Sequence, residues 1–241
     1  MSELDQFFEL MGAVVRDGDD GVALARRFGE SPSGRARVAH YATLVRRQHI
    51  EALDGFFAVL RAALAVEHAE LWSALRDTWL TRHCSPARHP SGLGRAFAEW
   101  LSTEAPEERT AIGAVPLWAA ELAHLACLQH EVAIAAPSPL GVARVASFTH
   151  DVVATLRSMA STPRVVVVPV RDATYALIHP DPETLRTRVV RIGGQEVAVL
   201  AWAAGEAELG MLEQLGITAA MAAATLARLQ PKLGVFVTIA S

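Results

Sequence analysis

One pair of residues has the spacing of metal ligands on a helix. Glu121 and His124 form a Glu-x-x-His sequence within a segment of helical periodicity, so both side chains lie on one face, as in di-iron helical bundles. Such a bundle requires a second pair of this kind and two further carboxylates, and the sequence has no second pair. We therefore expect Glu121 to be a structural carboxylate on an apolar stripe, and we predict no metal site in this chain.

Other residues capable of chemistry form incomplete sets. His83, Cys84 and His89 lie in one predicted loop and lack the nearby fourth ligand that a structural zinc site needs. No serine has a Gly-x-Ser-x-Gly context, neither cysteine accompanies a motif histidine, and the early glycines form no phosphate-binding pattern. We predict that the chain has no catalytic residue and no cofactor of its own.

Composition narrows the classes of partner. The chain of 241 residues has a net charge of −4, and Lys232 is its only lysine, so a strongly basic surface for nucleic acid is not evident. Two cysteines are too few for a disulfide framework. No apolar run approaches the roughly 20 residues of a membrane helix, and the acidic N-terminus has no signal-peptide pattern. We expect a cytoplasmic protein without a membrane segment.

The elements that must position any site fall into two groups. From about residue 3 to residue 160 apolar residues recur at helical spacing, which predicts a larger, all-α domain over residues 1–162. Its longest expected helix carries one stripe of apolar residues, and three further helices carry shorter stripes. The long stripe comprises Val38, Tyr41, Val45, His49, Leu53, Phe56, Leu60 and Leu64; the shorter ones comprise Leu71, Leu75 and Trp79, then Leu93, Phe97, Trp100 and Leu101, then Trp118, Leu122, Leu125 and Val132. Ser91 is the expected N-cap of the helix that carries Leu93 and Phe97. Residues 140–159 are also expected to be helical.

After Pro163 the sequence changes to β-branched runs. Strands are expected at residues 164–170, 186–192 and 195–202, with Gly193 and Gly194 forming a hairpin turn between the last two. Two helices should follow at residues 206–215 and 218–229, and residues 234–239 could return as a strand. The fold class is therefore α+β, with a smaller winged-helix-like domain over residues 163–241.

Arginines mark two candidate surfaces. The first surface lies around the start of the long helix and could meet acidic groups or remain a solvated helix face; it comprises Arg26, Arg27, Arg35, Arg37, Arg46 and Arg47. The second lies on the strand at residues 186–192, where Arg186, Arg188 and Arg191 would protect an edge against aggregation. The same edge could accept an extended peptide by strand addition.

The helical half resembles a known bacterial family. The residues that carry the resemblance span about residues 30 to 135 and comprise Arg37-x-x-x-Tyr41, Glu51-x-Leu53, Phe56-Phe57, Leu60, Leu71, Pro90-x-x-Leu93, Phe97, Trp100-Leu101 and Pro116-x-Trp118-x-x-Glu121-Leu122-Ala123-x-Leu125. The family has been labelled DNA-binding and includes the methanobactin-biosynthesis partner subunits. The resemblance implies a subunit that pairs with a TIM-barrel multi-iron oxidase, which holds the iron and modifies cysteines of a ribosomally made precursor peptide.

The resemblance also implies a different binding role for each of the two domains. The helical domain would dock on the oxidase, and we assign Tyr41, Arg46, Arg47 and Trp118 to that interface. The C-terminal domain would be similar to a peptide-recognition element that binds the leader peptide between a strand edge and a helix. We assign to this site Arg188, Arg191, Val197, Val199, Ala201, Leu226 and Leu229. The alternative is a DNA-binding regulator that uses residues 206–229 as a helix-turn-helix.

Overall fold

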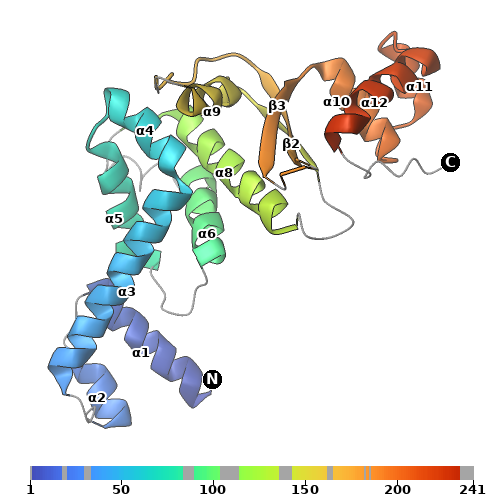
Figure 1. Ribbon diagram of the computed structural model, residues 1–241. Helices are drawn as coiled ribbons and strands as arrows, with labels where there is room; N and C mark the ends of the chain where they lie inside the picture. Colours follow the sequence, from blue (N-terminus) through green and yellow to red (C-terminus); the bar gives the residue numbers. More distant parts are fainter. Residues whose placement is uncertain are drawn as a thin grey trace. The chain divides into compact units, whose positions relative to one another are not determined.

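The chain divides into two compact units, whose helices and strands are labelled in Figure 1. The computed structural model describes residues 2–17, 21–29, 34–83, 90–103, 114–135, 143–161, 165–181, 183–184 and 186–233. Unit 1 is Met1–Ala123 and unit 2 is His124–Ser241. The division therefore lies well before residue 162, where the change in sequence texture places it, because segments between residues 124 and 161 pack with the sheet of unit 2.

All the regular secondary structure described in unit 1 is helical. Its helices are α1 (Glu3–Asp17), α2 (Val22–Phe28), α3 (Arg35–Phe56), α4 (Ala58–Glu67), α5 (Leu71–His83), α6 (Pro90–Thr103) and the first turns of α8 (Leu117–Ala135). The expected long helix is divided at Phe57, which is buried and separates α3 from α4. The long stripe is confirmed at Val45, His49, Leu53, Leu60 and Leu64, all buried, whereas Tyr41 is 52% exposed. The shorter stripes are buried as predicted.

Aromatic rings fill the centre of unit 1. Phe97 on α6 is fully buried, and its ring centroid lies 5.0 Å from that of Phe57 and 5.7 Å from those of Trp72, Trp79 and Trp100. Tilted and edge-on ring pairs at these distances add to the stabilisation from burial alone. The helix that carries Phe97 begins at Pro90 and includes Ser91, so the prediction of Ser91 as its N-cap is wrong.

Unit 2 contains a three-stranded antiparallel sheet and helices on both of its faces. Its elements are the remainder of α8, then β1 (Arg144–Phe148), α9 (Val152–Ala160), β2 (Thr174–Pro180), β3 (Thr187–Ile192), α10 (Gly194–Ala203), α11 (Leu209–Gln214) and α12 (Ala219–Leu233). The strand order is β1-β2-β3, with Ala146 opposite Ala176 and Leu177 opposite Val190. The α+β class predicted from the sequence is confirmed.

The strand register assigns different helices to the two faces. On one face Leu177 and Ile192 pack against Leu229 of α12, with Val190, Val197 and Leu200 around them. On the other face α9 contacts β2 and β3 and buries Val152 and Val153. Thr187 on β3 donates a hydrogen bond to the carbonyl of Gln129 on α8 at 3.2 Å. The sheet is therefore covered by α8 and α9 on one side and by α10 and α12 on the other.

Several predicted boundaries in unit 2 are wrong. Residues 140–159 were expected to form one helix, but β1 occupies residues 144–148 and α9 begins only at Val152. The described residues 165–170 form no strand, and the strand lies at Thr174–Pro180 instead. Helix α12 runs to Leu233, past Pro231, where the sequence predicts its end. The expected strand at residues 234–239 lies outside the described residues.

Within the described part of the chain, no helix combines the length and apolar character that a membrane span requires.

Candidate functional site

Strand β3 lies at one edge of the described sheet, and helices α10, α11 and α12 follow it in the sequence. It pairs with β2 along Thr187–Ile192, and no described strand pairs with its other side. An edge strand presents backbone N–H and C=O groups that another extended chain can pair with. β3 therefore has the main-chain geometry of a strand-addition site.

The residues after β3 form a helix, which corrects the expected hairpin. Gly193 is extended (φ −86°, ψ 164°) and precedes α10, and Glu196 accepts a hydrogen bond from its N–H at 2.5 Å. This contact caps the start of the helix. Val197, Val199 and Ala201 therefore lie on α10, and the prediction that they form an edge strand is wrong.

The apolar candidates for peptide contact are mostly part of the core. Val199 and Leu226 belong to one buried cluster with Leu212, Ile217 and Ala222. Leu229 is 1% exposed and packs against Leu177 and Ile192. Val197 and Ala201 are half-buried. Of the five apolar candidates, only these two keep surface for a ligand.

Arg191 joins β3 to the start of α9. Its guanidinium donates to Asp151 Oδ2 at 2.8 Å and to Asp172 Oδ2 at 2.9 Å. The hydrogen bond to Asp172, together with the charges of both carboxylates, raises the pKa of Arg191 against the opposing effect of desolvation. Asp151 is also the N-cap of α9, where it accepts from the N–H of Ala154 at 2.9 Å. Arg191 is therefore a structural bridge whose side chain remains 43% exposed.

Arg188 forms a second bridge at the opposite end of the strand. It pairs with Asp181, whose carboxylate also accepts from the backbone N–H groups of Glu183 and Thr184, at 2.9 and 3.0 Å. The hydrogen bond from the N–H of Thr184 is the main reason that the pKa of Asp181 is lowered, with the charge of Arg188 acting in the same direction. Arg188 is 63% exposed and can still meet a ligand.

The residues assigned to a partner interface differ in exposure. Tyr41 and Arg47 are exposed on α3, although Arg47 pairs with Glu51 four residues later at 2.8 Å. Arg46 is half-buried, and Trp118 is only 7% exposed. Trp118 is therefore a core residue and not a ready contact for another protein.

The candidate metal ligands are not assembled. Among the described residues, no group of three or more His, Cys, Asp and Glu side chains is placed to hold a metal ion. Glu121 and His124 both lie on α8, and the His124 ring centroid is 6.2 Å from that of Phe148. His83 stacks on Trp79 at 5.7 Å, and Cys84 and His89 lie outside the described residues.

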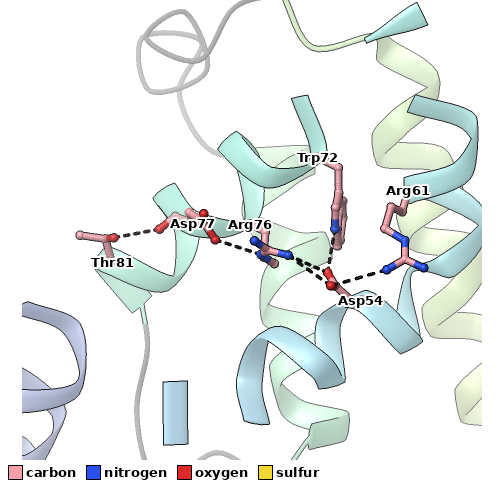
Figure 2. Close-up of polar contacts among 6 residues, drawn as sticks. All are labelled: Asp54, Arg61, Trp72, Arg76, Asp77 and Thr81. Atoms are coloured by element: carbon pink, nitrogen blue, oxygen red, sulfur yellow. Dashed lines mark hydrogen bonds and ion pairs between the residues drawn. The ribbon is translucent and has the colours of Figure 1, made fainter. Parts of the chain in front are cut away.

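A half-buried polar network, which the sequence did not single out, connects three helices of unit 1 (Figure 2). Asp54 on α3 accepts from the indole N–H of Trp72 at 2.8 Å and from Arg76 at 3.0 Å, both on α5. Arg61 on α4 lies 3.5 Å from the same carboxylate, and Arg76 also donates to Asp77 at 2.9 Å. Desolvation lowers the pKa of Arg76, but the hydrogen bonds and charges of Asp77 and Asp54 outweigh it and raise this pKa overall.

The network around Asp54 stabilises the packing of α3, α4 and α5 and does not have the properties of a binding site. Its central carboxylate accepts hydrogen bonds from the Trp72 indole and the Arg76 guanidinium and forms an ion pair with Arg61, and Arg76 is directed at two carboxylates. Charged groups that are already paired in this way need no ligand to satisfy them. We therefore place the candidate functional site on β3 and the helices that follow it.

Comparison with known proteins adds no family assignment. No family model matches the chain, and a search of curated proteins found no significant match.

Proposed function

We propose that this chain is a non-catalytic accessory subunit, which pairs with a TIM-barrel multi-iron oxidase and binds the leader of a ribosomally made precursor peptide. In this proposal the oxidase holds the iron and oxidatively modifies a cysteine of the peptide, in the cytoplasm. The observation that carries the proposal is the side of β3 that pairs with no strand in the described part of the chain, and three helices follow this strand directly in sequence.

The edge of β3 that no described strand covers supplies the affinity in this mechanism. A leader peptide that adds as a further strand would form main-chain hydrogen bonds with β3, largely independent of its side chains. The exposed guanidinium of Arg188 lies on the same strand and can meet a carboxylate of the peptide. Charged groups at the margin of such a site mainly determine the partner and the association rate.

The helices beside β3 supply the apolar contacts. Val190 on β3 and Val197 and Leu200 on α10 are half-buried around Leu177, Ile192 and Leu229. Half-buried apolar side chains beside an unpaired strand can cover every second side chain of an added peptide. This arrangement replaces the strand of Val197, Val199 and Ala201 that the sequence predicts.

The order of elements also supports the proposal. β2 and β3 are followed by α10, α11 and α12, which is the order of strands and then helices expected of a winged-helix-like peptide-recognition element. The resemblance of the helical half to oxidase partner subunits points to the same role.

Co-expression with a TIM-barrel multi-iron oxidase from the same genome tests the proposal. The expected result is a stable complex in size-exclusion chromatography, with iron in the complex and none in this subunit purified alone. The purified complex should bind a fluorescent leader peptide. Iron in the isolated subunit, or two proteins that elute separately, would contradict the proposal.

A DNA-binding regulator is the competing function, and one observation favours it. α11 and α12 are joined through Gly216, which has a φ of 73°, as the two helices of a helix-turn-helix could be. However, Arg228 is the only basic residue between Thr218 and Leu229, and it donates to Glu196 at 2.6 Å. Retardation of duplex DNA with a steep salt dependence would replace our proposal with this one.

A further inference from the structure

Positive charge is concentrated on α2 and the first half of α3. Between residues 22 and 50 the sequence has six arginines and one glutamate, in a chain whose net charge is −4. These arginines are Arg26, Arg27, Arg35, Arg37, Arg46 and Arg47. Positive charge is therefore concentrated in this part of an otherwise acidic chain. This part of unit 1 attracts acidic groups electrostatically.

Most of these arginines are not paired with a carboxylate of the described residues, so their guanidinium groups can meet a partner. Arg26, Arg37 and Arg46 form no ion pair with any residue that the structure describes. Arg27 donates to Gln6 Oε1 at 3.1 Å, which is a neutral contact. Arg47 pairs with Glu51, and six arginines elsewhere in the chain also face a carboxylate: Arg61, Arg76, Arg144, Arg188, Arg191 and Arg228.

Apolar side chains are exposed among these charges. Arg37, Tyr41, Leu44 and Arg47 follow one another at steps of three or four and share the outer face of α3. Tyr41 is 52% exposed and Leu44 44%, whereas the opposite side of the helix buries Ala42, Val45 and Leu53. Arg26, Arg27 and Phe28 are exposed on α2, and α1 contacts both α2 and α3. We call the exposed residues of these two helices the α2–α3 face: Arg26, Arg27, Phe28, Arg37, Tyr41, Leu44 and Arg47.

The aromatic part of this face continues onto α1. The ring centroid of Phe28 lies 5.7 Å from that of Phe7, which lies 5.8 Å from that of Phe8. All three rings are more than a third exposed. The guanidinium carbon of Arg27 lies 5.2 Å from the Phe28 ring centroid, close enough for a cation–π contact.

The composition of the face indicates the chemistry of its partner. Arginine and aromatic residues are enriched in protein–protein interfaces, whereas lysine is depleted, and guanidinium groups match carboxylates in paired hydrogen bonds. The exposed Tyr41 and Leu44 also add apolar area that a phosphate backbone does not use.

We propose that the α2–α3 face docks onto an acidic surface of a folded partner protein, whose carboxylates meet the arginines and whose apolar centre meets Tyr41 and Leu44. This inference rests on the proposed function, in which the partner is the oxidase, and it adds the chemistry of the oxidase surface. Trp118, which the sequence assigned to this interface, has no part in it because it is buried.

The decisive variant is Arg37→Glu. Arg37 is exposed in the first turn of α3, where a negative charge is compatible with the helix dipole, so the variant should fold. Tyr41→Ala is the second variant, because it removes apolar contact without a change of charge. Arg157→Glu is the matched control, because Arg157 is exposed on α9 in unit 2 and forms no ion pair with a described residue.

The measurement is the dissociation constant between this chain and the multi-iron oxidase, determined by biolayer interferometry at low and high salt. Arg37→Glu should weaken binding about tenfold or more at low salt and less at high salt, because exposed charges are screened. Tyr41→Ala should weaken it by a factor that does not depend on salt. Arg157→Glu should leave it within about twofold of the original protein.

The possible failures are distinguishable. If the original chain binds the oxidase and Arg37→Glu binds equally well, the α2–α3 face is not the interface, although the proposed function stands. If the original chain does not bind the oxidase, both proposals fail. If the chain binds duplex DNA, and Arg37→Glu abolishes that binding but not binding to the oxidase, a nucleic acid replaces the acidic protein as the occupant.

Discussion

Asp54 on α3 accepts two hydrogen bonds from the guanidinium of Arg76 on α5, at 3.0 and 3.2 Å. The two residues are 22 positions apart, so this contact connects helices and not neighbouring turns of one helix. The Arg76 side chain is 15% exposed and that of Asp54 24%. A pair shielded to this degree is more sensitive to the loss of one partner than an exposed ion pair is.

Asp54→Ala should therefore destabilise unit 1. The change leaves the guanidinium of Arg76 with Asp77 alone and removes the acceptor of the Trp72 indole N–H. We expect a loss of about 1 to 3 kcal/mol in the free energy of unfolding, measured by urea denaturation. Arg61→Ala removes only a longer, half-exposed contact to the same carboxylate and should cost less than about 1 kcal/mol. Equal losses in the two variants would contradict this account.

The network explains why part of the structure could not be predicted from sequence. Helical periodicity identifies the buried side of α5 because Leu71, Leu75 and Trp79 repeat locally. It does not reveal which carboxylate on another helix meets Arg76, since that depends on how the helices pack. The break at Phe57 is hidden in a similar way, because the apolar stripe from Val45 to Leu64 continues across it without interruption.

The candidate site was harder to predict because two local signals conflict after β3. Gly193-Gly194 between β-branched runs is a hairpin pattern, whereas the following residues include alanine, leucine and glutamate, which favour helices. The helix prevails because Glu196 caps it and because Val199 enters a buried cluster with Leu212 and Leu226. Burial of Val199 against residues far along the chain has no signature in a short sequence window.

Stability should depend on pH through His49. Its side chain is buried on α3, and desolvation lowers its pKa below the ordinary value of 6.5. The unfolded chain therefore takes up a proton at higher pH than the folded chain does. Stability is complete above this ordinary value and is lost as the pH falls below it, until the folded state is protonated too.

Urea unfolding between about pH 8 and about pH 5 measures this dependence, whose slope is at most about 1.4 kcal/mol per pH unit for one proton. His49→Gln has no ionisable group and should show a flatter profile over this range. If the variant retains the full slope, other groups cause the pH dependence.

Two glycines of α6 should respond oppositely to alanine. A Cβ atom added to Gly94 would lie 2.9 Å from the ring of Phe56, whereas one added to Gly92 would meet nothing within 4 Å. Gly94→Ala should therefore cost about 1 to 3 kcal/mol through overpacking. Gly92→Ala should stabilise the protein by up to about 1 kcal/mol through helix propensity. The two thermal midpoints test this, and a stabilised Gly94→Ala would show that the Phe56 ring moves aside freely.

Arg191 should be required for the stability of unit 2. Arg191→Ala removes the donor to Asp151 and Asp172 and leaves two carboxylates close together, so the thermal midpoint should fall. Arg191→Lys should recover only part of the loss, because an ammonium group lacks the two-directional geometry of guanidinium. Arg157→Ala is the control for the loss of an arginine. A charge reversal at Arg191 is therefore a poor test of peptide binding, since instability and lost affinity would be confounded.

Amide hydrogen exchange gives a test of the peptide site that needs no substitution. If a leader peptide adds as a strand to β3, its main-chain hydrogen bonds should slow exchange in Thr187–Ile192 when the peptide is bound. Within β3, protection should alternate, because successive backbone groups point to opposite sides of the strand. The half-buried residues of α10 should show smaller changes, since their backbone is already bonded within the helix. Mass spectrometry of the chain with and without peptide measures this directly. Protection confined to β1, at the other edge of the sheet, would move the peptide site there, and protection confined to unit 1 would remove it from the sheet altogether.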